Sequence, residues 1–239
     1  MKTFTSILVL VVLGTGLWWW GEKNNMGEVA GEPVEGQSAE LCFARFTDSP
    51  DSEFHDKYAL RMNLEGESAE GRLRLLPAEK DALVGEFEGT VGAPQEPEMS
   101  RTANLIWSAE GEGMTAKQEM RIIFDSASAR LGFGEMVLSD DGIYEYKDPE
   151  KVDYSFILES TLCEYLNERE AVEKYLWENI AKLSSIAPTV GGNWYVVAAT
   201  VDIEKNTGVV TYEDGHVQEK RDFTYAIGAD AAVESMTIE

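Results

Sequence analysis

The sequence predicts a mainly β protein, built as an antiparallel up-and-down sheet or barrel with one amphipathic helix and an N-terminal transmembrane segment. Three observations lead to this prediction. Apolar and polar residues alternate with a period of two along most of residues 39–158. One later stretch has helical spacing, and a long uncharged run follows Lys2. The alternation is clearest in residues 102–133, where it resumes after the Gly-rich break at 111–113, which is typical of a hairpin with one buried face.

Residues 39–158 form the predicted antiparallel β region. Short alternating segments recur between turns, and they add up to seven or eight strands. Gly85 and Gly89 lie inside one such segment, and glycines within strands mark bulges or sharp bends. A sheet with many short strands and bends favours an up-and-down barrel or a sandwich.

Residues 159–186 form the predicted amphipathic helix. Thr161 and Glu164 have the spacing of a capping box, and Pro188 lies beyond the end of the helix. The apolar residues at helical spacing are Leu162, Leu166, Val172, Leu176, Ile180 and Leu183. An apolar stripe of this kind usually faces a core, so we expect the helix to cover a sheet or a barrel mouth; a partner-binding helix is the alternative.

Residues 187–239 form a predicted C-terminal β meander that packs with the first β region. A nearly continuous apolar strand spans 194–203, and Asp214-Gly215 is a strong two-residue hairpin turn. The pattern leaves open whether these strands complete the first sheet or form a second domain.

Residues 1–21 form a predicted membrane segment. No charge falls between Lys2 and Glu22, and this gap is long enough to span a bilayer core. The three tryptophans at 18–20 fit an aromatic belt at the membrane boundary. We therefore expect residues 4–21 to be a single-pass anchor with the bulk of the chain outside the cytoplasm; secretion after signal cleavage is the alternative. Residues 22–38 are polar, rich in Gly and Glu, and predict a flexible linker.

The charge and the motifs exclude several function classes. Residues 22–239 hold 19 Lys and Arg against 44 Asp and Glu, a net charge of −25, which argues against nucleic-acid binding. The chain has two histidines, His55 and His216, and lacks the Gly-rich phosphate and dinucleotide motifs, so no cofactor and no metal are expected. One acidic loop offers oxygen ligands that suit Ca²⁺, but it lacks the order and the Gly of an EF-hand, so a solvated loop is the favoured interpretation: Asp48, Asp51, Glu53 and Asp56.

Cys42 and Cys163 are the only cysteines. An even number of cysteines in an exported chain predicts a disulfide, and two buried free thiols are the alternative. A bridge between them would join the helix to the first strand.

Two short segments carry a resemblance to a known family. Gly192-Asn193-Trp194-Tyr195 resembles the Gly-x-Trp-Tyr that opens the first barrel strand of lipocalin-like proteins. Residues 85–89 and 108–111 are similar to segments of bacterial lipocalin-like, β-rich envelope proteins. The resemblance implies a β barrel or half barrel that holds a small apolar molecule.

These observations lead to a functional hypothesis. We expect a membrane-anchored, extracytoplasmic, non-enzymatic binding or interaction module, with a small apolar ligand or an envelope protein as its partner. An apolar ligand would need a cavity lined by inward residues such as Phe87, Trp107, Met120 and Phe133. A ligand-free structural envelope protein is the alternative, and it would fill that space with side chains. A hydrolase using acidic residues is the third candidate, and it would need carboxylates with perturbed pKa values in a cleft.

Overall fold

The computed structural model describes residues 38–47, 55–78, 80–189, 192–229 and 231–239. All of them belong to one structural unit, which spans residues 35–239. The predicted membrane segment and, apart from Ser38, the predicted linker lie outside the described residues. Within the described ranges, no helix combines the length and the apolar character that crossing a membrane requires.

The described residues form fourteen strands, one α-helix and one 3₁₀ turn at Pro149–Lys151. The strands before the helix are β1 (Ser38–Phe46), β2 (Lys57–Glu65), β3 (Ser68–Leu76), β4 (Leu83–Val91), β5 (Arg101–Gly111), β6 (Met114–Phe124), β7 (Ser128–Phe133), β8 (Met136–Leu138), β9 (Ile143–Tyr146) and β10 (Asp153–Thr161). The helix α1 spans Cys163–Leu183. The strands after it are β11 (Tyr195–Asp202), β12 (Thr207–Glu213), β13 (Gln218–Ile227) and β14 (Val233–Ile238).

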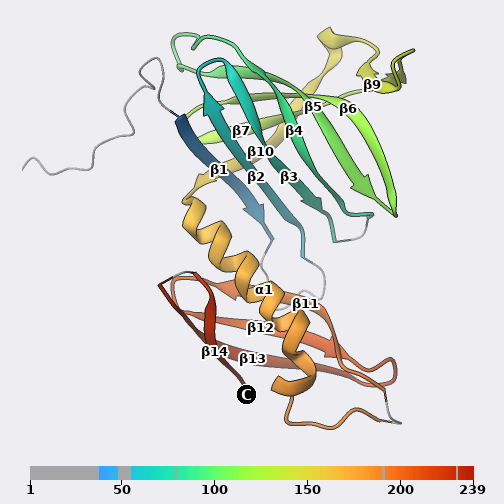
Figure 1. Cartoon of the computed structure of the whole chain (residues 1–239), viewed down its shortest axis with the longest axis vertical. Coiled ribbons are helices and arrows are strands. Elements are labelled where there is room, and N and C mark those ends of the chain that lie inside the picture. Colours follow the sequence, from blue (N-terminus) through green and yellow to red (C-terminus); the bar gives the residue numbers. More distant parts are fainter. Residues whose placement is uncertain (1–37, 48–54, 79, 190–191, 230) are drawn as a thin grey trace, which may run out of the picture. The chain divides into compact units, whose positions relative to one another are not determined.

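Eight strands close into an antiparallel barrel (Figure 1). Strands β1 to β7 pair with their neighbours in chain order, and β10 lies between β7 and β1 and closes the ring. The alternating pattern of residues 39–158 therefore predicts both the strands and their up-and-down order. Strands β8 and β9 form a short ribbon that extends the sheet from β6.

Side chains at alternate positions fill the barrel interior. The largest fully buried ones include Trp107, Phe43, Leu60 and Met62. Burying one large apolar side chain contributes about 1.5–3 kcal/mol, so this cluster is the main source of stability for the barrel. The remaining buried members are Tyr58, Leu64, Ala69, Leu73, Leu75, Phe87, Val91, Ala103, Leu105, Ala109, Met120, Ile122, Phe124, Ala129, Leu131 and Leu158.

Glycine allows neighbouring strands of the barrel to approach closely at two positions. A Cβ atom at Gly85 would lie 1.8 Å from the carbonyl oxygen of Ser108 on β5, and one at Gly71 would lie 2.0 Å from that of Arg61 on β2. No side chain fits at such distances, so glycine is required at both positions. The ladders of β3 and β4 run without a register shift, so these glycines allow close approach of the strands and mark no β-bulge.

The C-terminal strands form a sheet of their own, in the order β11-β12-β13-β14 (Figure 1). They do not pair with the barrel strands, which answers the question that the sequence leaves open. Their buried face packs on α1, and the shared core contains Val172, Leu176, Ile180, Trp194, Val196, Ala199, Val201, Val210, Tyr212, Phe223, Tyr225 and Met236. The apolar stripe of α1 thus covers this second sheet.

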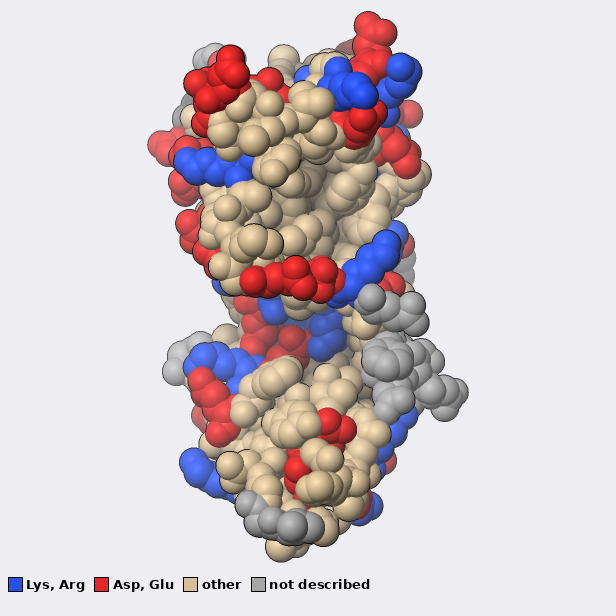
Figure 2. Space-filling view, turned by 90° about the vertical axis from the view of Figure 1, so that its right-hand side faces the viewer, with Lys and Arg blue, Asp and Glu red and all other residues tan. Residues whose placement is uncertain are grey.

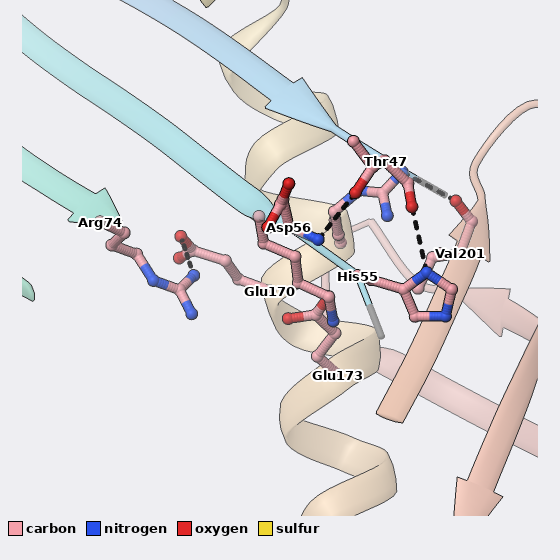
Figure 3. A network of polar contacts seen from close by, with 9 residues as sticks. Thr47, His55, Asp56, Arg74, Glu170, Glu173 and Val201 are labelled. Carbon is pink, nitrogen blue, oxygen red and sulfur yellow. Dashed lines mark hydrogen bonds and ion pairs between the residues drawn. The ribbon is translucent and has the colours of Figure 1, made fainter. Parts of the chain in front are cut away.

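The first half of α1 is also fixed to the barrel. A disulfide joins Cys163 to Cys42 on β1, with 5.2 Å between their Cα atoms. Leu166 packs beside Cys42 in a small cluster with two alanines of β1 and β2. Glu170 pairs with Arg74, and Glu173 pairs with Lys57, each at 2.7 Å (Figure 3).

Arg169 connects α1 to both sheets. Its guanidinium donates a hydrogen bond of 2.8 Å to the carbonyl oxygen of Val201 on β11. The same group lies over the ring of Phe46 on β1, 4.1 Å from the ring centroid. The buried guanidinium of Arg169 thus links the two sheets: it donates a hydrogen bond to one and stacks on an aromatic ring of the other.

The predicted capping box is wrong. The helix begins at Cys163, its N-cap is Leu162, and no side chain caps it. Thr161 is instead the last residue of β10, where it pairs in register with Cys42. Strand pairing and the disulfide, both non-local, determine where this helix starts.

Candidate functional site: the barrel interior and the β6–β7 seam

The ladder between β6 and β7 covers only part of these strands. It joins Ile122–Phe124 to Ala129–Leu131, whereas the β5–β6 ladder runs the whole length of both strands. Strand β7 pairs with β10, and β10 pairs in turn with β1. This ladder between β10 and β1 covers only Cys42–Ala44 of β1. The two-stranded wall β7–β10 is therefore bounded on both sides by short ladders. We call the place where the ladder between β6 and β7 ends, next to Arg121 and Gly132, the β6–β7 seam.

The hydroxyl of Tyr146 bridges this seam. It donates a 2.8 Å hydrogen bond to the carbonyl oxygen of Gly132 on β7 and accepts a 3.3 Å hydrogen bond from the backbone N–H of Arg121 on β6. Arg121 and Gly132 are the next pair in register after Ile122 and Leu131, so the hydroxyl takes the place of the missing ladder bond. Tyr146 is only 6% exposed, and burial raises the pKa of its hydroxyl. The group therefore stays protonated and able to donate at neutral pH.

Three further contacts hold Tyr146 in place. A carboxylate oxygen of Glu119 accepts a 3.0 Å hydrogen bond from the backbone N–H of Tyr146, and the guanidinium of Arg121 lies 5.5 Å from the ring centroid. Strand β9, which carries Tyr146, pairs in parallel with β6 at Lys117 and Gln118. The β8–β9 ribbon thus lines β6 where β7 has left it.

Trp107 lies at the centre of the barrel interior with an unsatisfied donor. Its side chain is 0% exposed, and its indole N–H has no hydrogen bond acceptor within the described part of the chain. A buried donor without an acceptor costs about 1–3 kcal/mol, so such groups are rare in folded proteins. Its register partners are Phe87 on β4 and Gln118 on β6. Gln118 is half-buried, and its amide is the polar group that shares this inward-facing row.

The structure brings three of the four predicted lining residues together. Phe87, Trp107 and Met120 belong to the barrel core. Phe133 does not: it is the last residue of β7, it is 38% exposed, and its ring packs against Phe156, 5.4 Å between centroids. Its place in the alternation points inward, but the strand ends at the rim, so Phe133 lies outside the core.

Aromatic rings and a cation cover the rim of the barrel beside Phe133. The guanidinium of Arg45 lies 4.0 Å from the ring centroid of Phe156 and 5.0 Å from that of Tyr58. The two rings meet edge to face at 4.8 Å. Burial raises the pKa of the Tyr58 hydroxyl. This rim is therefore closed by packing that a cation–π contact strengthens.

The acidic loop is mostly outside the described residues. Asp48, Asp51 and Glu53 lie there, and the carboxylate of Asp56 accepts a 2.9 Å hydrogen bond from the backbone N–H of Ala78. Figure 3 shows that Asp56 and His55 both contact Thr47. The backbone N–H of Asp56 donates a 2.7 Å hydrogen bond to the Thr47 hydroxyl, and Nδ1 of His55 lies 3.0 Å from the Thr47 carbonyl oxygen. These contacts tie together the ends of the β1–β2 connection.

Glu40 lies beside the disulfide. Its carboxylate and the sulfurs of Cys42 and Cys163 are within 4.8 Å of one another, a spacing that suits a metal ion. The disulfide engages both sulfurs, so this group does not offer thiolate ligands in the oxidised protein. The disulfide, rather than the free-thiol alternative, is the state of both cysteines in the structure.

Sequence reasoning missed two residues of this site. Gln118 interrupts an otherwise apolar inward row on β6, between Ala116 and Met120, and such a polar interruption is a signal that could have identified it. Tyr146 had no such signal, because its role depends on two strands far from it in the sequence.

Figure 2 shows one face of the molecule coloured by charge. In the upper part, over the barrel, charged side chains border an uncharged, hollowed area.

No protein-family model, curated protein or solved structure matches this chain.

Proposed function

We propose that this chain is a membrane-anchored, extracytoplasmic and non-enzymatic binding module whose barrel takes up a small apolar molecule. The observation that carries the proposal is the unpaired indole N–H of Trp107 inside a closed apolar barrel. A barrel that only supports its own fold gains nothing from a buried donor, because apolar side chains can fill a barrel without leaving a polar group unpaired. Phe87 and Met120, which are expected to contact such a ligand, belong to the same apolar core as Trp107.

An extracytoplasmic location fits the cysteine chemistry. The Cys42–Cys163 disulfide is of the kind that persists in oxidising compartments and is rare in the cytosol. In this proposal residues 4–21 anchor the chain and residues 22–239 face outward, with cleavage of the segment as the alternative. An envelope protein is the second class of partner, and it would use the outer surface of the barrel.

A ligand-free structural role is the second candidate function. It is favoured by the filled interior, where the large side chains of Trp107, Phe43, Leu60 and Met62 are fully buried. Small barrels commonly fill their interiors in this way. In that case the barrel is a rigid support, and its function lies in surfaces that it presents to other envelope components.

Native mass spectrometry of the full chain separates the two candidates. The protein would be exported by its host, purified in one chemically defined detergent and released from that detergent in the gas phase. An added mass that organic extraction removes would support the binding module and identify the ligand class. A ligand-free mass, unchanged after incubation with a lipid extract, would contradict it and favour the structural role.

A further inference from the structure

We propose that the barrel ligand is a small, neutral, apolar molecule with a hydrogen bond acceptor, and that the indole N–H of Trp107 binds this acceptor. The inference deepens the proposed function and rests on it. The donor is fully buried, faces the barrel interior and has no acceptor among the described residues. A ligand oxygen would accept the hydrogen bond that the indole N–H does not make within the protein. A buried donor of this kind favours ligands that carry an acceptor over ligands that lack one.

The charge of the ligand follows from the groups around this donor. Trp107 is flanked in register by Phe87 and by the neutral amide of Gln118, and the cluster that encloses it is apolar. A carboxylate or phosphate would lose its hydration here without meeting a counter-charge. Two cations among the described residues have inward positions at strand ends: Arg45 is stacked on two aromatic rings, and Arg101 donates hydrogen bonds to the carbonyl oxygens of Gly92 and Gly66. A ketone, ester or ether oxygen therefore suits the site, and an acid does not.

The β6–β7 seam provides the entrance. The interior is filled with side chains when the barrel is closed, so a ligand must enter where the wall can separate. The wall β7–β10 is held by short ladders, and at the seam a single hydroxyl, that of Tyr146, connects β6 to β7. Gln118 lies on β6 close to Arg121 and in register with Trp107, and it pairs with Tyr144 of β9, so the β8–β9 ribbon must separate from β6 together with β7 for a ligand to reach the donor.

A matched pair of probes tests the acceptor. The full chain would be titrated with a medium-chain methyl ketone and with the alkane of the same length, and binding would be measured by native mass spectrometry. The variant W107F removes the donor and keeps an aromatic ring, and W177F is the control because Trp177 is 60% exposed on α1. We expect the ketone to bind wild type and W177F equally and W107F about tenfold more weakly, and the alkane to bind all three alike.

The outcomes distinguish the two levels of the proposal. If neither probe binds the wild type, the proposed function itself fails. If the ketone binds and W107F binds it as well as the wild type does, the barrel or another site takes up apolar molecules, but the assignment to Trp107 is overturned. An independent readout covers the case in which W107F does not fold: the indole ¹H–¹⁵N signal of Trp107 in the wild type should move on addition of the ketone and not of the alkane. A signal that neither probe moves would refute the site.

The entrance has its own test. Y146F removes the hydroxyl that joins β6 to β7, and Y144F, at a residue of the same ribbon that is 41% exposed, is its control. We expect ketone uptake to be at least several times faster in Y146F than in the wild type and unchanged in Y144F. Equal uptake rates in Y146F and the wild type would place the entrance elsewhere.

Discussion

Reduction of the Cys42–Cys163 disulfide should lower the free energy of unfolding by several kcal/mol. The bond joins residues 121 positions apart, so it closes a loop that contains nearly the whole barrel. In the chain-entropy description, a loop of this length contributes about 5 kcal/mol, and native disulfides typically contribute about 2–5 kcal/mol. The reduced protein should remain folded, because Leu166 and the Glu170–Arg74 pair still hold α1 on the barrel after reduction.

The assay is urea unfolding of the full chain in detergent, with and without a reductant, followed by circular dichroism. The reduced protein should unfold at lower urea concentration, and the variant C42A/C163A should behave like the reduced wild type and not respond to reductant. Hydrogen exchange should also rise in the first turn of α1, which loses its link to β1. A difference below about 1 kcal/mol between oxidised and reduced protein would show that the long loop is already constrained in the unfolded state, and it would refute this reasoning.

Three further predictions concern single side chains. Y146F should lower the free energy of unfolding by about 1–3 kcal/mol, measured by urea titration, because one hydroxyl makes two hydrogen bonds to the backbone of β6 and β7; a loss below about 0.5 kcal/mol would show that the hydroxyl does not hold the seam. Hydrogen bonds from backbone N–H groups hold the pKa of Asp214 below its ordinary value of 3.8, so its contribution is present above that pH and is lost as pH falls through the lower, folded-state pKa. D214N should therefore be less stable at neutral pH and show a flatter decline of its melting temperature in acid; parallel curves for variant and wild type would contradict this. E173Q should cost about 1 kcal/mol, because it leaves the partly buried ammonium of Lys57 without a counter-charge, whereas E178Q, at an exposed pair, should cost less than about 0.5 kcal/mol.

The barrel could be predicted because its signal is local. Each strand places apolar residues at every second position, as in the run from Ala103 to Ala109, and neighbouring strands follow each other in the chain. The closure of the ring could not be predicted in the same way. It depends on β10 pairing with β1, and the residues that pair there, such as Cys42 and Thr161, are far apart in the sequence.

The start of α1 and its packing show the same limit. Thr161 and Glu164 have the spacing of a capping box, but the strand pairing of Thr161 overrides that local preference. The apolar stripe of α1 predicts a buried face without saying which sheet covers it. Val172, Leu176 and Ile180 pack on the second sheet, while Leu166 packs on the barrel.

The candidate site also has a part that local sequence patterns predict and a part that they do not. The inward positions of Phe87, Trp107 and Met120 follow from alternation, and the structure places all three in the core. The missing acceptor of Trp107 is a property of eight strands together, so no pattern in β5 alone reveals it. Phe133 failed as a lining residue because alternation gives the direction of a side chain but not the point at which the strand leaves the core.

Stability in the presence of ligand provides a test that does not depend on detecting the complex. A ligand that binds only the folded protein raises the free energy of unfolding in proportion to the logarithm of its concentration over its dissociation constant. At a hundred times the dissociation constant, the wild type should gain about 2.7 kcal/mol from the methyl ketone. A W107F protein that binds tenfold more weakly should gain only about 1.4 kcal/mol at the same concentration, whereas W177F should gain as much as the wild type.

The comparison separates the donor from the ring at that position. Replacing the indole of Trp107 by a phenyl ring removes the unpaired N–H, which stabilises the empty barrel, and leaves a small void, which destabilises it. These two effects oppose each other in the empty protein, so its stability alone says little about the role of the N–H. The gain on adding ketone depends only on the affinity of the folded protein for the ketone, so comparing the gains of W107F and the wild type leaves the stability of the empty barrel out of the comparison. A smaller gain in W107F consequently reports the bond to the ligand, and equal gains would mean that the indole N–H of Trp107 contributes nothing to binding.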